Sequence, residues 1–259
     1  RIRFRRFRFA GAISIVGLFI SPLVHAQPEL ANAFETLHAD ASWKLVRETS
    51  LGFDTHHPQG MTRVGDRVFL SSVEVVDRAA GKGVGHLFEI SESGELHRSL
   101  TLSDGPVYHP GGIDFDGTSI WLCLAEYRPD SRSIVYRIHP ASLVATEVFR
   151  FADHLGAVVH LPDARLLVGV SWGSRRIYAW DMQENGMGPL DASRPRVIKN
   201  PSLYVAYQDM QRIEGTNIVL ASGVRTLRGA GRETPAITLG GIDLLAFPGA
   251  VMRHGQPVN

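Results

Sequence analysis

Tyr108–Gly117 reads YHPGGIDFDG, and shortened versions of this phrase recur along the chain. Each copy opens on histidine or another polar residue, continues through small residues and leads into a short apolar run and a tight turn. The copies begin at His57, His109, His154 and Gln208, at steps of 52, 45 and 54 residues. About 40–50 residues is the repeat length of one four-stranded blade in a β-propeller. The repeat therefore predicts that fold.

Further strand-like runs follow each phrase in the same order. Turns rich in Gly, Asp and Asn separate apolar runs of about 4–8 residues without a 3.6-residue stripe, a pattern that favours strands. A β-sandwich also has short strands, but it does not require one phrase at the start of every fourth strand. We therefore expect an all-β propeller. The second strands are expected at 67–75, 119–126, 165–170 and 217–221, the third at 86–90, 134–138, 176–180 and 242–247, and the fourth at 95–102, 145–151, 195–198 and 250–254.

Two blade counts fit the sequence. Four four-stranded blades are visible, and a further strand is expected at Trp43–Thr49, ahead of the first. Either that strand closes a four-bladed ring, or the chain belongs to a five-bladed ring whose last blade is cut off after Asn259. We favour the five-bladed ring, with a lead-in over 27–41 and a C-terminally truncated propeller domain over 42–259.

The first 26 residues have the three-part layout of a signal peptide. Five arginines and no acid occupy Arg1–Arg8, an apolar run follows over 10–24, and Val24–Ala26 forms a small-residue cleavage site. The run is shorter than the roughly 20 residues that span a bilayer. We expect cleavage, no stable membrane span afterwards, and a secreted or periplasmic protein. An uncleaved N-terminal anchor is the alternative.

Composition excludes several classes of protein. Of the 259 residues, 44% are hydrophobic and 20% charged, which suits a folded core. Removing 1–26 leaves 22 basic residues against 26 acidic ones, so no nucleic-acid partner is expected. The single cysteine, Cys123, excludes an intramolecular disulfide and a multi-cysteine zinc site, and its apolar neighbours predict an inert core thiol. Gly169–Gly173 matches the G-x-S-x-G elbow of hydrolases, but a strand rather than a helix is expected after it, so a nucleophilic Ser171 is disfavoured.

Propeller geometry brings the start of each first strand next to the end of the second strand. His57 and Glu74 are 17 residues apart, and the same spacing separates His109 from Glu126. We therefore expect one mouth of the central channel to gather imidazoles and carboxylates. The residues expected there are His57, His109, His154, Asp209, Glu74 and Glu126.

Imidazole together with carboxylate suits Zn²⁺ or Mn²⁺, whereas sets dominated by carboxylate suit Ca²⁺. The metal-ligand candidates are His57, His109, His154 and Asp209. The catalytic candidates are Glu74 and Glu126 with two cations that follow second strands, Arg128 and Arg175, either of which suits the carboxylate or phosphate of a substrate. The structural alternative is that the histidines hydrogen-bond neighbouring blades and hold the ring closed.

Several phrases resemble the signature of a bacterial family of exported, propeller-like proteins of unassigned function, over roughly 42–247. Members of that family run further at the C-terminus, which agrees with a truncated fifth blade. More distantly, the chain resembles the gluconolactonase, paraoxonase and strictosidine synthase superfamily, which implies a calcium ion in the channel mouth and hydrolysis of lactones or phosphotriesters. The superfamily's ligands are mostly Glu, Asn and Asp, and this chain departs from them by placing His at three strand starts. The phrases are GKGVGHLF (81–88), YHPGGIDFDG (108–117), AEYRP (125–129), SWGSR (171–175) and YQD (207–209).

Two functions stay open, and the sequence does not decide whether the protein is an enzyme. The first is a metal-assisted hydrolase of small esters or lactones, in which a cation activates the attacking water. The second is a non-catalytic propeller that binds a small-molecule ligand or a partner on the same face.

Overall fold

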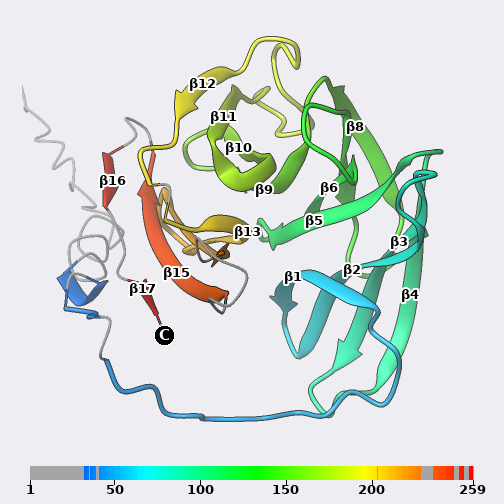
Figure 1. Ribbon diagram of the computed structural model, residues 1–259. Helices are drawn as coiled ribbons and strands as arrows, with labels where there is room; N and C mark the ends of the chain where they lie inside the picture. The colour runs from blue at the N-terminus through cyan, green and yellow to red at the C-terminus, as the bar shows by residue number, and fades with distance from the viewer. Residues whose placement is uncertain are drawn as a thin grey trace, which may run out of the picture.

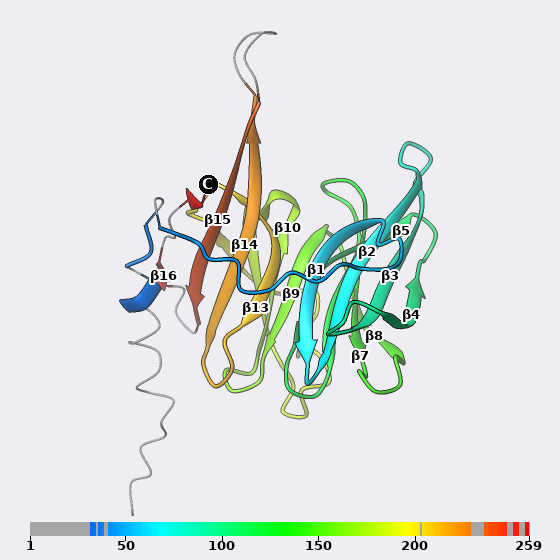
Figure 2. The ribbon, with the colours of Figure 1, turned by 90° about the horizontal axis from the view of Figure 1, so that it is seen from below.

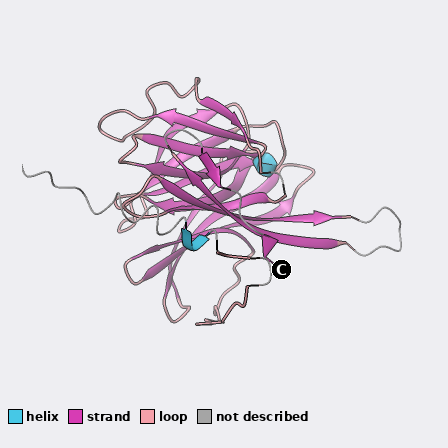
Figure 3. Ribbon diagram, turned by 90° about the vertical axis from the view of Figure 1, so that its left-hand side faces the viewer, coloured by secondary structure: helices cyan, strands magenta, loops and turns pink. Residues whose placement is uncertain are grey.

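The computed structural model describes residues 32–34, 36–38, 41–202, 204–228, 236–247, 251–253 and 257–258. Within these ranges nearly all regular structure is β-strand (Figure 3). The signal peptide expected over 1–26 lies outside the described residues. In the described part of the chain, no helix has the length and apolar character needed to cross a membrane.

In the described part of the chain, the strands form three sheets, and most strands that follow one another within a sheet pair antiparallel. The first sheet holds β1 (His57–Val64), β2 (Arg67–Asp77), β3 (Lys82–Ser91) and β4 (Leu96–Leu102). The second, eight-stranded sheet holds β5 (Val107–Phe115), β6 (Ile120–Glu126), β7 (Ser133–Ile138), β8 (Ala145–Phe151), β9 (Leu155–Leu161), β10 (Leu166–Ser171), β11 (Arg176–Asp181) and β12 (Arg196–Lys199). The third holds β13 (Ala206–Arg212), β14 (Ile218–Leu227), β15 (Ile237–Ala246), β16 (Val251–Arg253) and β17 (Pro257–Val258). A short 3₁₀ turn, η1 (Trp172–Ser174), links β10 to β11.

The sheets are arranged radially. Figure 1 shows β1, β5, β9 and β13 nearest the centre, with β4, β8, β12 and β16 on the outside. The eight-stranded sheet consists of two four-stranded units joined by one parallel pairing, Gly112 of β5 with Ala157 of β9. Radial four-stranded antiparallel units define a β-propeller, so the predicted all-β propeller is confirmed. The number of blades in the ring stays a prediction.

Glycines allow the inner strands to approach one another closely at the centre. A Cβ added to Gly111 of β5 would lie 2.2 Å from the carbonyl oxygen of Gly156 in β9. A Cβ added to Gly60 of β1 would lie 2.6 Å from Cα of Gly112. Real Cβ atoms do not approach so closely, so the small residues of the repeated phrase have a packing reason. Backbone from several units therefore fills the centre at this level.

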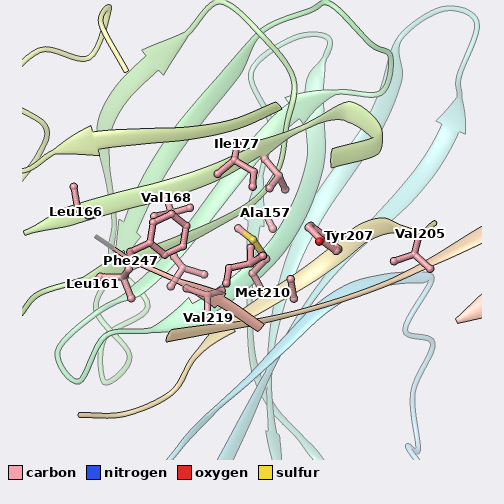
Figure 4. Packing of buried hydrophobic residues seen from close by; sticks show 14 residues of the cluster. Ala157, Leu161, Leu166, Val168, Ile177, Val205, Tyr207, Met210, Val219 and Phe247 are labelled. Carbon is pink, nitrogen blue, oxygen red and sulfur yellow. The ribbon is translucent and has the colours of Figure 1, made fainter. Parts of the chain in front are cut away.

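Apolar side chains pack face to face between neighbouring units. Figure 4 shows one such core, between β9–β11 and β13–β15, where side chains from the two units point toward one another. Burial of this apolar surface is the main force that holds adjacent units together. Its members include Ala157, Val168, Ile177, Met210, Val219 and Phe247.

The prediction of a strand at Trp43–Thr49 is wrong. Residues 43–49 form no strand, and the side chains of Trp43 and Val46 are 61% and 91% exposed. The position that a closing N-terminal strand would take, outside β15, is occupied by β16 and β17. The sequence run is apolar enough for a strand, but the place beside β15 is already taken by β16 and β17.

The β14–β15 hairpin projects beyond the body of the molecule (Figure 2). Its pairing runs from Ile218 with Ala246 out to Leu227 with Ile237, well past the shorter strands expected from the sequence. In its outer part, the side chains of Val224, Leu227 and Ile237 are 47%, 42% and 59% exposed, so pairing between the two strands rather than burial in a core accounts for this part of the ribbon.

Candidate functional site

A small pocket of about 240 Å³ lies where the four inner strands begin, and we call it the His pocket. The three histidines that the repeated phrase was expected to bring together, His57, His109 and His154, all line it. Every one of the four units contributes to the wall. The full lining is His57, Gln59, His109, Tyr127, His154, Gly156, Ser171, Trp172, Gly173, Ala206, Tyr207 and Gln208.

His109 is buried in the wall of the pocket and is held neutral. Its ring stacks on Tyr127 with 4.1 Å between ring centroids, and its Nδ1 atom is buried without a hydrogen-bond partner. Burial, with smaller contributions from His154 and His57, lowers the pKa of His109 to about 3. A proton on this imidazole would be poorly solvated, so the ring is neutral at pH 7.

His154 is held in one orientation and one tautomer. Its Nδ1 lies 2.9 Å from the backbone carbonyl oxygen of Glu126, and its ring meets Trp172 edge-on at 4.7 Å. A carbonyl oxygen can only accept, so Nδ1 of the neutral ring carries the proton and Nε2 keeps its lone pair. Burial lowers the pKa of His154, which keeps the ring neutral at pH 7.

Aromatic rings and one cation complete this side of the pocket. The rings of Tyr127 and Trp172 lie 6.0 Å apart, and the guanidinium of Arg78 sits 3.9 Å from the centroid of Tyr127. Arg78 was missed because it follows β2 of the first unit, and no sequence pattern linked it to Tyr127.

Glu126 and Arg128 form an ion pair beside the pocket. The buried Glu126 carboxylate accepts hydrogen bonds from Nε of Arg128 at 2.8 Å and Nε of Arg132 at 2.7 Å. Burial acts to raise the pKa of Glu126, but these hydrogen bonds outweigh it and lower the pKa. Glu126 and Arg128 line a neighbouring hollow of about 500 Å³, which shares Tyr127 with the His pocket. Their predicted catalytic roles stay predictions.

Asp209 ties the inner strands together beneath the pocket. Its carboxylate accepts the backbone N–H of Met61 in β1 at 3.0 Å, of Ile113 in β5 at 3.1 Å and of Met210 in β13 at 3.0 Å. Burial raises the pKa of Asp209 to about 7, against the lowering effect of these amides. Asp209 is not among the residues that line the His pocket. Backbone donors thus engage both carboxylate oxygens, and the metal-ligand role predicted for this residue stays a prediction.

The other two predicted residues, Glu74 and Arg175, are not among those that line the His pocket. Glu74 is next to His56 and His86, and one donor atom from each of these three residues lies within 4.8 Å of the others, close enough to hold a metal ion. The sequence missed this cluster because the repeated phrase pointed to His57 rather than to its neighbour His56. Arg175 is exposed just after η1, with its Nε 3.9 Å from where a Cβ on Gly173 would lie.

Comparison with solved structures shows fold similarity at very low sequence identity. MPT-4, a mannose phosphorylase from Leishmania mexicana in complex with phosphate ion, is 11% identical with a TM-score of 0.53, over 91% of this chain and 78% of the other. A putative 6-phosphogluconolactonase from Bacteroides uniformis is 12% identical with a TM-score of 0.44, over 75% of this chain and 54% of the other. The β-propeller domain of the Trilobed protease from Pyrococcus furiosus is 10% identical with a TM-score of 0.39, over 79% and 57%. Such similarity concerns the fold alone.

A search of curated proteins gave no match. A family model does match, over residues 16–259, and it describes a family of unknown function. With nearly the whole chain covered, the protein belongs to that family of unknown function, DUF6454.

Proposed function

We propose that the His pocket is the hydrolytic site of an exported enzyme that cleaves small esters or lactones, with His154 as the general base. The single observation that carries the proposal is the fixed state of His154. Its Nδ1 faces a carbonyl oxygen at 2.9 Å, burial lowers its pKa, and its ring forms part of the pocket wall. A neutral, oriented imidazole with a free Nε2 lone pair is the commonest general base in enzymes.

The proposed reaction proceeds in two steps. Nε2 of His154 takes a proton from a water molecule as the water oxygen attacks the carbonyl carbon of the substrate and forms a tetrahedral intermediate. The resulting imidazolium then returns the proton to the leaving oxygen as the C–O bond breaks, which regenerates the neutral ring. The products are a carboxylic acid and an alcohol, or a hydroxy acid when the substrate is a lactone.

The size and lining of the pocket limit the substrate. A volume of about 240 Å³ falls below the ~300–1,000 Å³ of pockets that hold drug-sized ligands. Tyr127 and Trp172 offer apolar surface, whereas the amides of Gln59 and Gln208 offer hydrogen bonds. We therefore propose a compact substrate with one apolar face and an ester or lactone group.

The test is hydrolysis of a panel of small esters and lactones by the purified protein. His154→Gln keeps a polar side chain but removes the base, and it is expected to lower kcat by about 10²–10⁴-fold, the usual contribution of a general base. His97→Gln, at an exposed position on β4, is the matched control and is expected to retain full activity. Activity that survives in a folded His154→Gln variant contradicts the proposal.

Non-catalytic binding of a small ligand is the second candidate, and one observation favours it. Among the described residues, the lining of the His pocket includes no acidic one, and two of the three carboxylates expected there, Glu126 and Asp209, accept hydrogen bonds from protein donors. Binding without turnover is expected to change the fluorescence of Trp172, and a Trp172→Phe variant is expected to abolish the change.

Sequencing the N-terminus of the protein isolated from outside the cytoplasm tests the proposed export.

A further inference from the structure

We propose that His56, Glu74 and His86 form a binding site for one divalent transition-metal ion, with zinc the best match. The site lies in the first unit, on β2, β3 and the loop that leads into β1. It does not rest on the hydrolytic role proposed for the His pocket, although His57, the residue after His56, lines that pocket.

Three donor atoms already converge at this position. Nε2 of His86 lies 3.5 Å from a carboxylate oxygen of Glu74, and Nε2 of His56 lies 3.9 Å from the same oxygen. Two donors bound tetrahedrally to one zinc ion, each about 2.0–2.1 Å from it, are about 3.3 Å apart. These two separations exceed that value by about 0.2–0.6 Å, and one donor atom from each of the three residues lies within 4.8 Å of the others, so the imidazoles have to turn to bring all three donors to zinc distance.

Among the described residues, the Nε2 atom of His86 has no hydrogen-bond partner at normal distance. It is a buried polar atom without a hydrogen bond, and its 3.5 Å distance to Glu74 exceeds the ~2.7–3.2 Å of an N–H···O bond. Leaving a buried polar atom unpaired is costly, so such atoms call for an explanation. A metal ion between His86, Glu74 and His56 would satisfy this nitrogen directly.

Packing places the two imidazoles beside each other, but the lone pair of an imidazole nitrogen lies in the ring plane, so these near-parallel rings have to tilt before both nitrogens bind one ion. The rings of His56 and His86 stack at 5.0 Å with 21° between their planes, and His86 stacks in turn on Phe88 at 5.3 Å. The backbone of His56 has a φ of +53°, a conformation that costs a non-glycine residue energy. In that conformation the His56 ring stacks on His86 and its Nε2 lies 3.9 Å from Glu74.

The carboxylate of Asp54 contacts His56 at its backbone N–H and lies near its ring. The Asp54 carboxylate accepts the backbone N–H of His56 at 2.8 Å and lies 3.7 Å from its Nδ1. A carboxylate on the far ring nitrogen of a metal-bound histidine is a common second contact, because it orients the ring and makes Nε2 more basic.

The donor set indicates which metal fits. Two imidazole nitrogens and one carboxylate oxygen suit zinc and neighbouring transition metals, whereas calcium takes six to eight oxygen ligands. Three protein ligands on zinc leave a fourth position for water or for an exogenous ligand.

The test is titration of the chelator-treated full-length protein with Zn²⁺ alone, followed by calorimetry and by metal analysis after dialysis. We expect about one zinc ion per chain in the wild type. Glu74→Gln and His56→Gly are each expected to weaken binding at least ~100-fold, since loss of even a second-shell partner costs about 10–100-fold. His97→Gln, on β4 of the same unit, is the control and is expected to bind as the wild type does.

The His56→Gly variant keeps the test decisive if Glu74→Gln fails to fold. Glycine adopts a φ of +53° without strain, so this variant is expected to have an unchanged or higher Tm without metal while losing the rise in Tm that Zn²⁺ gives the wild type. Absorption of the Co²⁺-loaded protein provides a second readout, expected in the wild type and absent in His56→Gly. Wild-type protein that takes up no more metal than His56→Gly, or variants that bind as tightly as the wild type, would overturn the proposal.

Discussion

Replacing Gly111 with alanine tests the packing at the centre of the molecule. The new Cβ would lie 2.2 Å from the carbonyl oxygen of Gly156 and 2.7 Å from Sγ of Cys123. An ordinary C···O contact is about 3.3–3.6 Å, so β5 and β9 would have to separate by about 1 Å. β9 is also paired to β10 along its whole length, and close-packed interiors yield little. Overpacking of this kind typically costs about 1–3 kcal/mol, and we expect Gly111→Ala to reach about 3 kcal/mol because the contact is with backbone.

The assay is urea unfolding, and two other glycines provide controls. In thermal unfolding, a loss of about 3 kcal/mol in the free energy of unfolding corresponds to a Tm lower by roughly 6–12 °C for a chain of this size. Gly156 occupies the position after His154 that Gly111 occupies after His109. A Cβ added to Gly156 has its nearest neighbour at 3.8 Å, and one added to Gly52 has nothing within 4 Å. Gly156→Ala and Gly52→Ala should change stability by less than about 1 kcal/mol. Equal losses for Gly111→Ala and Gly156→Ala would refute the reasoning.

Three further predictions concern buried titratable groups. Burial raises the pKa of Cys123 to about 12, so the native protein should resist alkylation by iodoacetamide until it unfolds, and rapid labelling would contradict this. Burial acts to raise the pKa of Asp116, but hydrogen bonds from His160, Trp121 and nearby amides lower it from 3.8 to about 2. Asp116→Asn should therefore lose about 2 kcal/mol at pH 7 in urea unfolding, a difference that fades as the pH falls from about 4 toward 2. Burial raises the pKa of Asp114 to about 8, so the folded state binds more protons than the unfolded one between pH 3.8 and 8, and stability falls as pH rises through that window. Lowered histidine pKa values oppose this below pH 6.5, so the fall should be clearest from 6.5 to 8. Asp209, whose pKa is raised to about 7, contributes to the lower part of that range, so Asp114→Asn should reduce the fall most between pH 7 and 8.

The repeated phrase predicted the fold because its spacing reflects the radial repeat itself. The fourth strand expected at 145–151 agrees with β8 (Ala145–Phe151), and the third strand at 134–138 differs from β7 by one residue. Prediction failed where strand formation depends on a partner rather than on local pattern. Trp43–Thr49 has the apolar residues of a strand but pairs with no described strand, and the outer part of β14–β15 extends past the runs expected from the sequence.

The site was predictable in part for the same reason. His57, His109 and His154 line one pocket because equivalent positions of a radial repeat face the same centre. The spacing of 17 residues places Glu126 near that pocket, but it carries no information on where the side chain points, and two arginines bind its carboxylate. The roles of Glu74, Arg128, Arg175 and Asp209 depend on such side-chain contacts.

The most direct test of the shared His pocket is NMR of the protein labelled with ¹⁵N in its histidine rings, recorded as the pH is lowered. His109 should stay neutral far below 6.5, the ordinary pKa of histidine, because burial and its neighbours hold its pKa near 3. His154 should show a protonated Nδ1 and a bare Nε2 at neutral pH, as its hydrogen bond to Glu126 requires. Two rings that both titrate near 6.5, like histidines in water, would contradict the convergence of these strands on one buried pocket.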